Sequence, residues 1–197
     1  MGRTFTNITV EGQTQDILVN YLSQHKRNAY VSPSVDNFVV VYDEDSEFNL
    51  EELSKLSLQI SKDFSCLTFP IVINDESVFS YELYESGNLM DEYCSSAEED
   101  LFPEGGDAQK LYTIFGVKQS ISKVRPILRE PSTEKVYLFA SERHKKLVKE
   151  LGLSVWSTEV IGGYSDIEEE EIDAIVFDED DFPDVEATLS MLKSTFT

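Results

Sequence analysis

Length, composition and charge place this chain among acidic globular proteins. Its 197 residues are 41% hydrophobic, and 16 Lys and Arg stand against 38 Asp and Glu, a formal net charge of −22. Because phosphate backbones and anionic lipids are bound through Lys and Arg, this charge argues against a nucleic-acid or membrane partner, and the apolar content argues against intrinsic disorder.

The first half of the chain alternates strand and helix patterns. Apolar residues recur at helical spacing in residues 14–27, which Thr14 would cap, and in residues 49–64, where Asn49 begins a capping-box pattern. The run Phe38–Tyr42 is apolar on both faces, which predicts a central strand. Further strands are expected at residues 3–10, 28–35, 67–74, 77–84 and 89–94.

This order of elements predicts an α+β fold. The first half is expected to form a ferredoxin-like split β-α-β antiparallel sheet with a hairpin extension, followed by a helix-rich second half. A loop at residues 96–106 separates the two parts. We therefore expect a sheet-rich domain at residues 1–96 and a helix-rich α+β part at residues 106–197 packed on it, with one single domain as the alternative.

The second half is expected to be mainly helical. Asp107 and Ser141 are the predicted N-caps of two helices, and a third helix at residues 118–130 should kink or restart at Pro126. Near the end, residues 172–177 predict a short apolar strand. Residues 183–196 predict a helix because Val185, Leu189, Leu192 and Phe196 recur along one side.

Residues 166–186, "DIEEEEIDAIVFDEDDFPDVE", hold twelve carboxylates and no Lys or Arg. The segment does not match a calcium-binding EF-hand, because Pro183 and Leu189 occupy positions that need Gly and Glu. The histidines and cysteines of the chain lack zinc-ligand spacing as well: His25, Cys66, Cys94 and His144. We expect neither a metal nor a cofactor.

A basic helix precedes this acid run, with Arg143, Lys145, Lys146 and Lys149 close together. One hypothesis is that the acid run folds back and partly neutralises this helix. Exposed ion pairs contribute only about 0–1 kcal/mol each, so the gain would be modest and sensitive to salt. The alternative is that both surfaces are simply solvated.

No residue is predicted to be catalytic. The chain has no G-x-S-x-G nucleophile elbow, and the glycines of "PEGGDAQ" have no P-loop lysine after them, so turn geometry is the better interpretation. With 38 carboxylates, the sequence cannot single out an acid–base pair.

The most distinctive patch is "YELYESGNLMDEYC", residues 81–94, which predicts a hairpin with tyrosines beside carboxylates. Tyr81 should face one side of the sheet, and Glu82 and Tyr84 the other. Such a face could bind a basic protein if exposed; the alternative is a sheet face covered by the later helices. The candidate partner or ligand surface comprises Tyr81, Tyr84, Glu92, Asp107, Arg143 and His144.

Five segments together resemble a family of uncharacterised bacterial proteins: "AYVSP", "VVYDE", "YELYESGNLMDEY", "GGDA" and "FASERH". The resemblance covers about residues 1–150 and implies no activity or binding residue. By composition alone, the chain is also similar to compact acidic bacterial α+β proteins that neutralise toxins.

A cytoplasmic location is expected. The segment "MGRTFTNITVEG" has no apolar stretch of the kind found in secretion signals, and no run of about 18 apolar residues occurs. The two cysteines, Cys66 and Cys94, are far apart in the sequence, which is typical of a protein in a reducing compartment.

Two interpretations of the function stay open. The first is a non-catalytic protein-binding module of the immunity or regulatory type, whose acidic surface takes a basic protein partner. The alternative is an enzyme or small-ligand-binding protein with a site between the two halves, built from the same six candidate residues. A closed pocket where these residues converge would favour the alternative.

Overall fold

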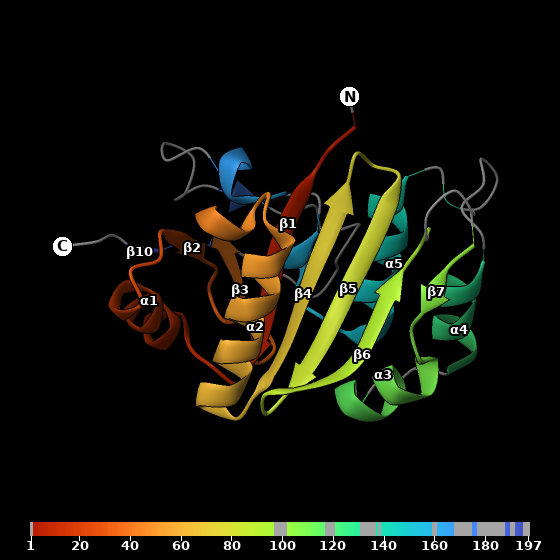
Figure 1. Cartoon of the computed structure of the whole chain (residues 1–197), viewed down its shortest axis with the longest axis horizontal. Coiled ribbons are helices and arrows are strands. Elements are labelled where there is room, and N and C mark those ends of the chain that lie inside the picture. Colours follow the sequence, from red (N-terminus) through yellow and green to blue (C-terminus); the bar gives the residue numbers. More distant parts are fainter. Residues whose placement is uncertain are drawn as a thin grey trace.

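An antiparallel β-sheet runs through the molecule and carries helices on both faces (Figure 1). The computed structural model describes residues 2–96, 102–116, 121–130, 137, 139–158, 161–167, 175–176, 188–189 and 192–194. Within these ranges, eight strands form the sheet in the order β10, β2, β3, β1, β4, β5, β6, β7. The predicted α+β class is confirmed.

Four strands form the middle of the sheet. β1 (Phe5–Glu11) lies between β3 (Phe38–Asp43) and β4 (Leu67–Asn74), and β2 (Ala29–Val31) pairs with β3. All of these pairings are antiparallel. Every residue of β3 is buried, as its apolar run predicts for a strand covered on both faces.

Two helices cover one face of this central region (Figure 1). α1 (Gln15–Gln24) and α2 (Leu50–Phe64) lie within the predicted helical ranges. Each predicted cap is present, because the Asn49 side chain accepts a hydrogen bond from the Glu52 amide at 3.3 Å and Thr14 caps α1 in the same way. The helical apolar residues Leu18, Leu22, Leu53, Leu56 and Ile60 pack on Ile8, Val10, Val39 and Val41 of the sheet.

A hairpin extends the sheet beyond β4. β5 (Val78–Glu85) and β6 (Asn88–Cys94) are joined by a turn at Ser86 and Gly87, both with positive φ. The register shifts between Leu83 and Tyr84, as at a β-bulge. β7 (Glu104–Gly105) pairs with the end of β6 and closes this side of the sheet.

Three helices cover the opposite face: α3 (Ala108–Phe115), α4 (Ile121–Arg129) and α5 (Ala140–Leu151). Their apolar side chains and those of β4, β5 and β6 form one hydrophobic cluster. Asp107 caps α3 as predicted, whereas α4 continues through Pro126 and does not restart there. No helix in the described ranges has the length and apolar character needed to span a membrane.

A smaller hydrophobic cluster packs on β2 and β3, on the face opposite to α1 and α2. The short helices η1 (Glu44–Ser46), η2 (Val155–Ser157) and η3 (Tyr164–Asp166) follow strand and loop segments at this end. Trp156 of η2 is fully buried among Tyr30, Val40 and Tyr42, and the Tyr42 hydroxyl donates a hydrogen bond to the Trp156 carbonyl.

The helix predicted for residues 183–196 is wrong. The described residues of this segment form β9 (Thr188–Leu189) and β10 (Leu192–Ser194), and β10 pairs with β2 at the edge of the main sheet. The Ser194 hydroxyl accepts a hydrogen bond from the Ala29 amide at 3.1 Å. The open edge of β2 supplies backbone partners that outweigh the local helical pattern.

The N-cap predicted at Ser141 is also wrong, because α5 begins at Ala140, two residues earlier than predicted, with Phe139 as its N-cap. The Ser141 hydroxyl instead donates to Glu76 at 2.7 Å. Within the predicted strand at residues 172–177, β8 (Ile175–Val176) is present and pairs with β9. The rest of the acid run from 168 to 186 lies outside the described residues, so its contact with the basic helix stays a prediction.

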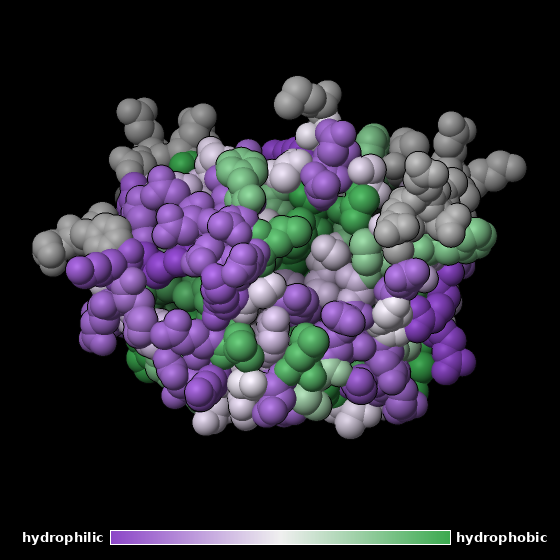
Figure 2. Space-filling model, viewed as in Figure 1, coloured by the Kyte–Doolittle hydropathy of each residue, from purple (hydrophilic) through white to green (hydrophobic). Residues whose placement is uncertain are grey.

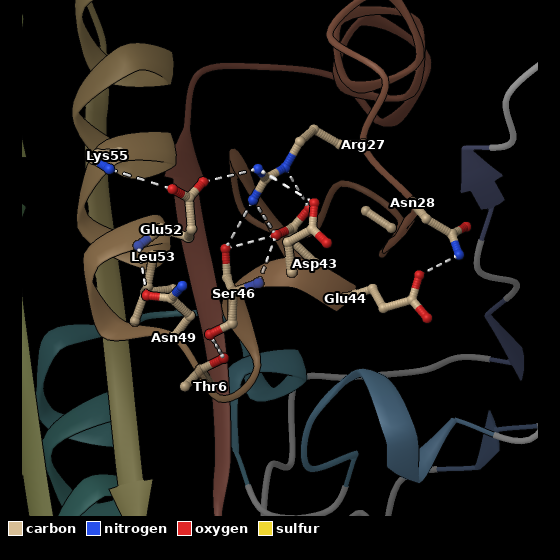
Figure 3. Close-up of polar contacts among 12 residues, drawn as sticks. Thr6, Arg27, Asn28, Asp43, Glu44, Ser46, Asn49, Glu52, Leu53 and Lys55 are labelled. Atoms are coloured by element: carbon tan, nitrogen blue, oxygen red, sulfur yellow. Dashed lines mark hydrogen bonds and ion pairs between the residues drawn. The ribbon is translucent and has the colours of Figure 1, made fainter.

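An ion-pair network around Arg27 joins β3, η1 and α2 (Figure 3). The guanidinium donates two hydrogen bonds to Asp43, at 2.9 and 2.5 Å, and a third to Glu52 at 3.2 Å. The side chain of Asp43 is only 1% exposed, and it also accepts from the amide and hydroxyl of Ser46. A buried carboxylate that is matched in this way fixes the position of the start of α2.

We predict that Arg27→Met destabilises the protein by about 3 kcal/mol, because it leaves the buried Asp43 carboxylate without its cation. Urea unfolding measures this change. The matched control is Lys55→Met, which removes only exposed pairs with Glu51 and Glu52 and should change stability by less than about 1 kcal/mol. Equal effects of the two substitutions would contradict the prediction.

Candidate functional site

A groove of about 270 Å³ opens beside α2, over β4, β5 and β6. Figure 2 shows this face hollowed next to α2, with apolar surface inside the hollow and hydrophilic side chains around it. It lies on the same face of the sheet as α1 and α2, where β5 and β6 extend beyond the helices (Figure 1). The groove is lined by Leu50, Leu53, Ser54, Pro70, Val72, Ser80, Glu82, Glu92, Cys94, Glu104 and Gly105, and by parts of Tyr81 and Tyr93.

The groove combines an apolar floor with an acidic rim. Pro70 and Val72 of β4 and Leu53 of α2 supply apolar surface, and Glu82, Glu92 and Glu104 supply carboxylates from three neighbouring strands. None of the described residues that line the groove is a Lys, Arg or His. The groove therefore presents the chemistry that suits a ligand with an apolar part and a positive charge.

Glu82 and Glu92 stand directly opposite each other in the β5–β6 hairpin. Side chains at such positions have Cβ atoms about 5 Å apart, and like charges there destabilise a sheet. The Tyr84 hydroxyl donates a hydrogen bond to Glu82 at 2.7 Å and so holds that carboxylate in place. Burial and the Glu82 hydrogen bond both raise the pKa of Tyr84, which keeps the hydroxyl protonated as a donor.

Three of the six predicted site residues belong to this region, and one of them, Tyr81, contributes only part of itself to the lining. Glu92 lines the groove, and Tyr84 lies beside it on the same face, buried beneath its polar contact with Glu82. Tyr81 points to the opposite face and packs in the cluster with α3, α4 and α5. The predicted alternation of Tyr81 against Glu82 and Tyr84 is thus confirmed, and the later helices cover the Tyr81 side.

Tyr81 and Asp107 meet at the edge of that opposite face. The Tyr81 hydroxyl and the Asp107 backbone amide both donate to the same oxygen of Asp91, each at 2.9 Å. The rings of Tyr81 and Tyr93 are stacked, with their centroids 5.3 Å apart. Burial, followed by the charge of Asp91, raises the pKa of Tyr81. These contacts tie β6 to the start of α3.

Arg143 is fully buried and holds α4 against α5. Its guanidinium donates to the carbonyls of Ile127 and Glu130 at the C-terminal end of α4, and to the Tyr93 hydroxyl at 3.1 Å. It also lies over the Tyr137 ring, 4.2 Å from the centroid. A cation at the carbonyl end of a helix is favoured by the helix dipole, so this arrangement stabilises the fold.

His144 is fully buried beside Phe79, with the two ring centroids 5.0 Å apart. Neither ring nitrogen has a hydrogen-bond partner among the described residues. Burial lowers its pKa to about 3, because the charged imidazolium would lose its hydration. The structure therefore places Arg143 and His144 in the core and not at the groove.

Of the residues that line the groove, only Glu92 and Tyr81 were among the six predicted from the sequence. A signal was present, since Ser80 and Glu82 alternate with the apolar Phe79 and Tyr81, and Glu92 lies across the turn at Gly87. The contributions of α2 and β7 depend on tertiary packing. In the described part of the chain, no group of three or more His, Cys, Asp or Glu side chains could hold a metal ion.

Comparison with known proteins identifies no relative on which a function could be based. No family model, curated protein or solved structure matches the chain. The resemblance to a bacterial family therefore stays a prediction, and the chemistry of the groove is the guide to function.

We predict that His144→Leu removes an acid-sensitive contribution to stability. The folded-state pKa of about 3 lies below the ordinary value of 6.5, so as the pH falls the unfolded chain takes up this proton first. The wild type should lose stability between about pH 6.5 and pH 3, by up to about 1.4 kcal/mol per pH unit, and the variant should lack this part of the slope.

Urea unfolding at a series of pH values measures the effect. His25→Leu is the matched control, because it removes a histidine that is exposed and not buried. Parallel curves for the wild type and His144→Leu would refute the assignment.

We also predict that Glu92→Gln stabilises the free protein by about 0.5 kcal/mol, since it relieves the repulsion from Glu82 across the hairpin. The gain should shrink in high salt, where exposed charges are screened. Urea unfolding at low and high ionic strength checks both points. Glu51→Gln removes a charge outside the groove together with its Lys55 pair and should not stabilise; a loss of stability in Glu92→Gln would contradict the prediction.

Proposed function

We propose that this protein is a non-catalytic binding module that takes a basic protein partner through the groove beside α2. The observation that carries the proposal is the pair of opposed carboxylates, Glu82 and Glu92, on an open sheet face where none of the described groove residues is basic. Opposed like charges destabilise the free hairpin, and a cation from a partner removes that repulsion. Their presence is therefore better explained by a complex than by the fold.

The net charge of −22 supports the same partner class. A strongly acidic surface attracts basic proteins over several ångströms and raises the association rate, and the effect weakens as salt is added. Immunity proteins, other protein inhibitors and regulatory subunits act by binding a partner in this way. The same charge supports the expectation that the protein does not bind nucleic acid.

The alternative, an enzyme or small-ligand site between the two halves, has less support. It would need Arg143 and His144 to converge with Glu92, but these two side chains lie in the core on the other face of the sheet. The donors of Arg143 already reach carbonyls of α4, and the His144 ring packs beside Phe79.

Two further features belong to the proposal. The order β2, β3, β1, β4 with α1 and α2 on one face supports the ferredoxin-like split β-α-β arrangement for the first half. The free thiols of Cys66 and Cys94 support a reducing cytoplasm as the site of action.

The test is affinity capture from the source cells with the wild type and with the double variant Glu82→Gln/Glu92→Gln. We expect the wild type to enrich basic proteins that the double variant loses by about tenfold or more, since two interfacial charge contacts are removed. Quantitative mass spectrometry measures the enrichment, and titration calorimetry with the purified partner at two salt concentrations measures the affinity.

The matched control is Asp16→Asn/Glu51→Gln, which removes two exposed carboxylates outside the groove and should keep the partner. Partners that are lost equally from both double variants would mean that only the overall charge matters. Partners retained by the groove variant would contradict the proposal.

A further inference from the structure

We infer that the groove seats one long basic side chain, an arginine or lysine of the partner, with its stem on the apolar floor and its charge between Glu82 and Glu92. This inference rests on the proposed function and adds how the partner is recognised. The groove volume of about 270 Å³ suits one large side chain better than a packed helix.

The floor and the rim are arranged for the two parts of such a side chain. Pro70 and Val72 of β4 lie next to β5, and the carboxylates of β5 and β6 follow on the same face. Lys and Arg cover apolar surface with their methylene groups and keep the charged end in a polar environment. The groove offers both environments side by side.

The carboxylate of Glu82 is preorganised for a cation in the free protein. The hydrogen bond from Tyr84 fixes its carboxylate, and Tyr84 itself is buried against the sheet. Glu92, on the neighbouring strand, is exposed. A charged ligand held between the fixed carboxylate of Glu82 and the exposed carboxylate of Glu92 makes charge-assisted hydrogen bonds to both, and the fixed partner lowers the entropy lost on binding.

Backbone pairing with the partner is blocked at the neighbouring edge of the sheet. The carbonyl of Met90 accepts a hydrogen bond from the Lys110 ammonium group at 2.7 Å, and the carbonyl of Glu92 accepts one from the Gly106 amide at 2.6 Å. β7 occupies the end of β6 beyond this point. A partner strand therefore cannot extend β6 there, and recognition through a side chain remains.

The experiment is an amide NMR titration of the isotope-labelled full chain. The probes are N-acetyl-arginine amide, N-acetyl-lysine amide, the neutral analogue N-acetyl-citrulline amide, stemless methylguanidinium, and spermidine. We expect the arginine and lysine probes to shift the amides of Val72, Ser80 and Glu92. Citrulline and methylguanidinium should each bind about tenfold more weakly, because one lacks the charge and the other the stem.

Two substitutions test the charged part and the apolar part of the site separately. Glu92→Gln should weaken the arginine and lysine probes about tenfold, whereas Glu51→Gln should leave them unchanged. Val72→Thr keeps the shape of the side chain but makes the floor polar, and should weaken the long-stem probes and not methylguanidinium. The unfolding midpoint of each variant checks that it is folded, and the comparison of probes on the wild type does not depend on any variant.

The outcomes separate the inference from the proposed function. If methylguanidinium binds as tightly as the arginine probe, the side-chain seat is wrong, while a partner that is captured through Glu82 and Glu92 still supports the binding module. If spermidine binds about tenfold more tightly than both amino-acid probes, the ligand is a free polyamine and the inference is overturned. If no cationic probe shifts the groove and no basic partner is captured, both fail.

Discussion

The buried Asp43 carboxylate is the constraint on which the rest of this structure depends. It lies at the end of β3, almost without contact with water, and so requires a cation. Arg27 provides that cation, and its remaining donors reach Ser46 and Glu52. One ion pair therefore fixes the end of α1, the turn after β3 and the start of α2 in a single arrangement (Figure 3).

The ion-pair network around Arg27 also sets the geometry of the groove. Leu50, Leu53 and Ser54 belong to the first turns of α2, next to Glu52, and they form one wall of the groove. The other wall comes from the β5–β6 hairpin, which is held on its far side by Tyr81, Asp91 and the start of α3. Both walls of the groove are thus tied to the rest of the fold, and binding would need little rearrangement.

Local patterns were sufficient for the central sheet and its two helices. Asn49 caps α2, β3 is interior, and Tyr81 and Tyr84 take opposite faces, because each of these depends on neighbours within a few residues. The strand β10 could not be foreseen, since its partner β2 is distant in the sequence and the local spacing of Leu189 and Leu192 is helical. Long-range pairing outweighed a weak local preference.

The candidate site was predictable only in part, for a similar reason. Glu92 and Tyr84 were identified from the hairpin, but the depth of the groove comes from α2, whose approach to β4 and β5 depends on packing. Arg143 and His144 are polar residue types that usually lie at surfaces, and only the contacts with α4 and Phe79 explain why they are inside. Sequence alone does not distinguish a buried charged residue from an exposed one on an amphipathic helix.

The pairing of β10 with β2 has a consequence for synthesis on the ribosome. The hydrogen bond between Ala29 and Ser194 joins residues 165 positions apart, so β2 leaves the ribosome long before its partner exists. At about 5–20 residues per second, that delay is roughly 10 to 30 seconds. During this time the outer edge of the nascent sheet, at β2, is unpaired. Chaperones bind exposed edges of this kind, and without them neighbouring nascent chains on one polysome can pair through such edges and aggregate.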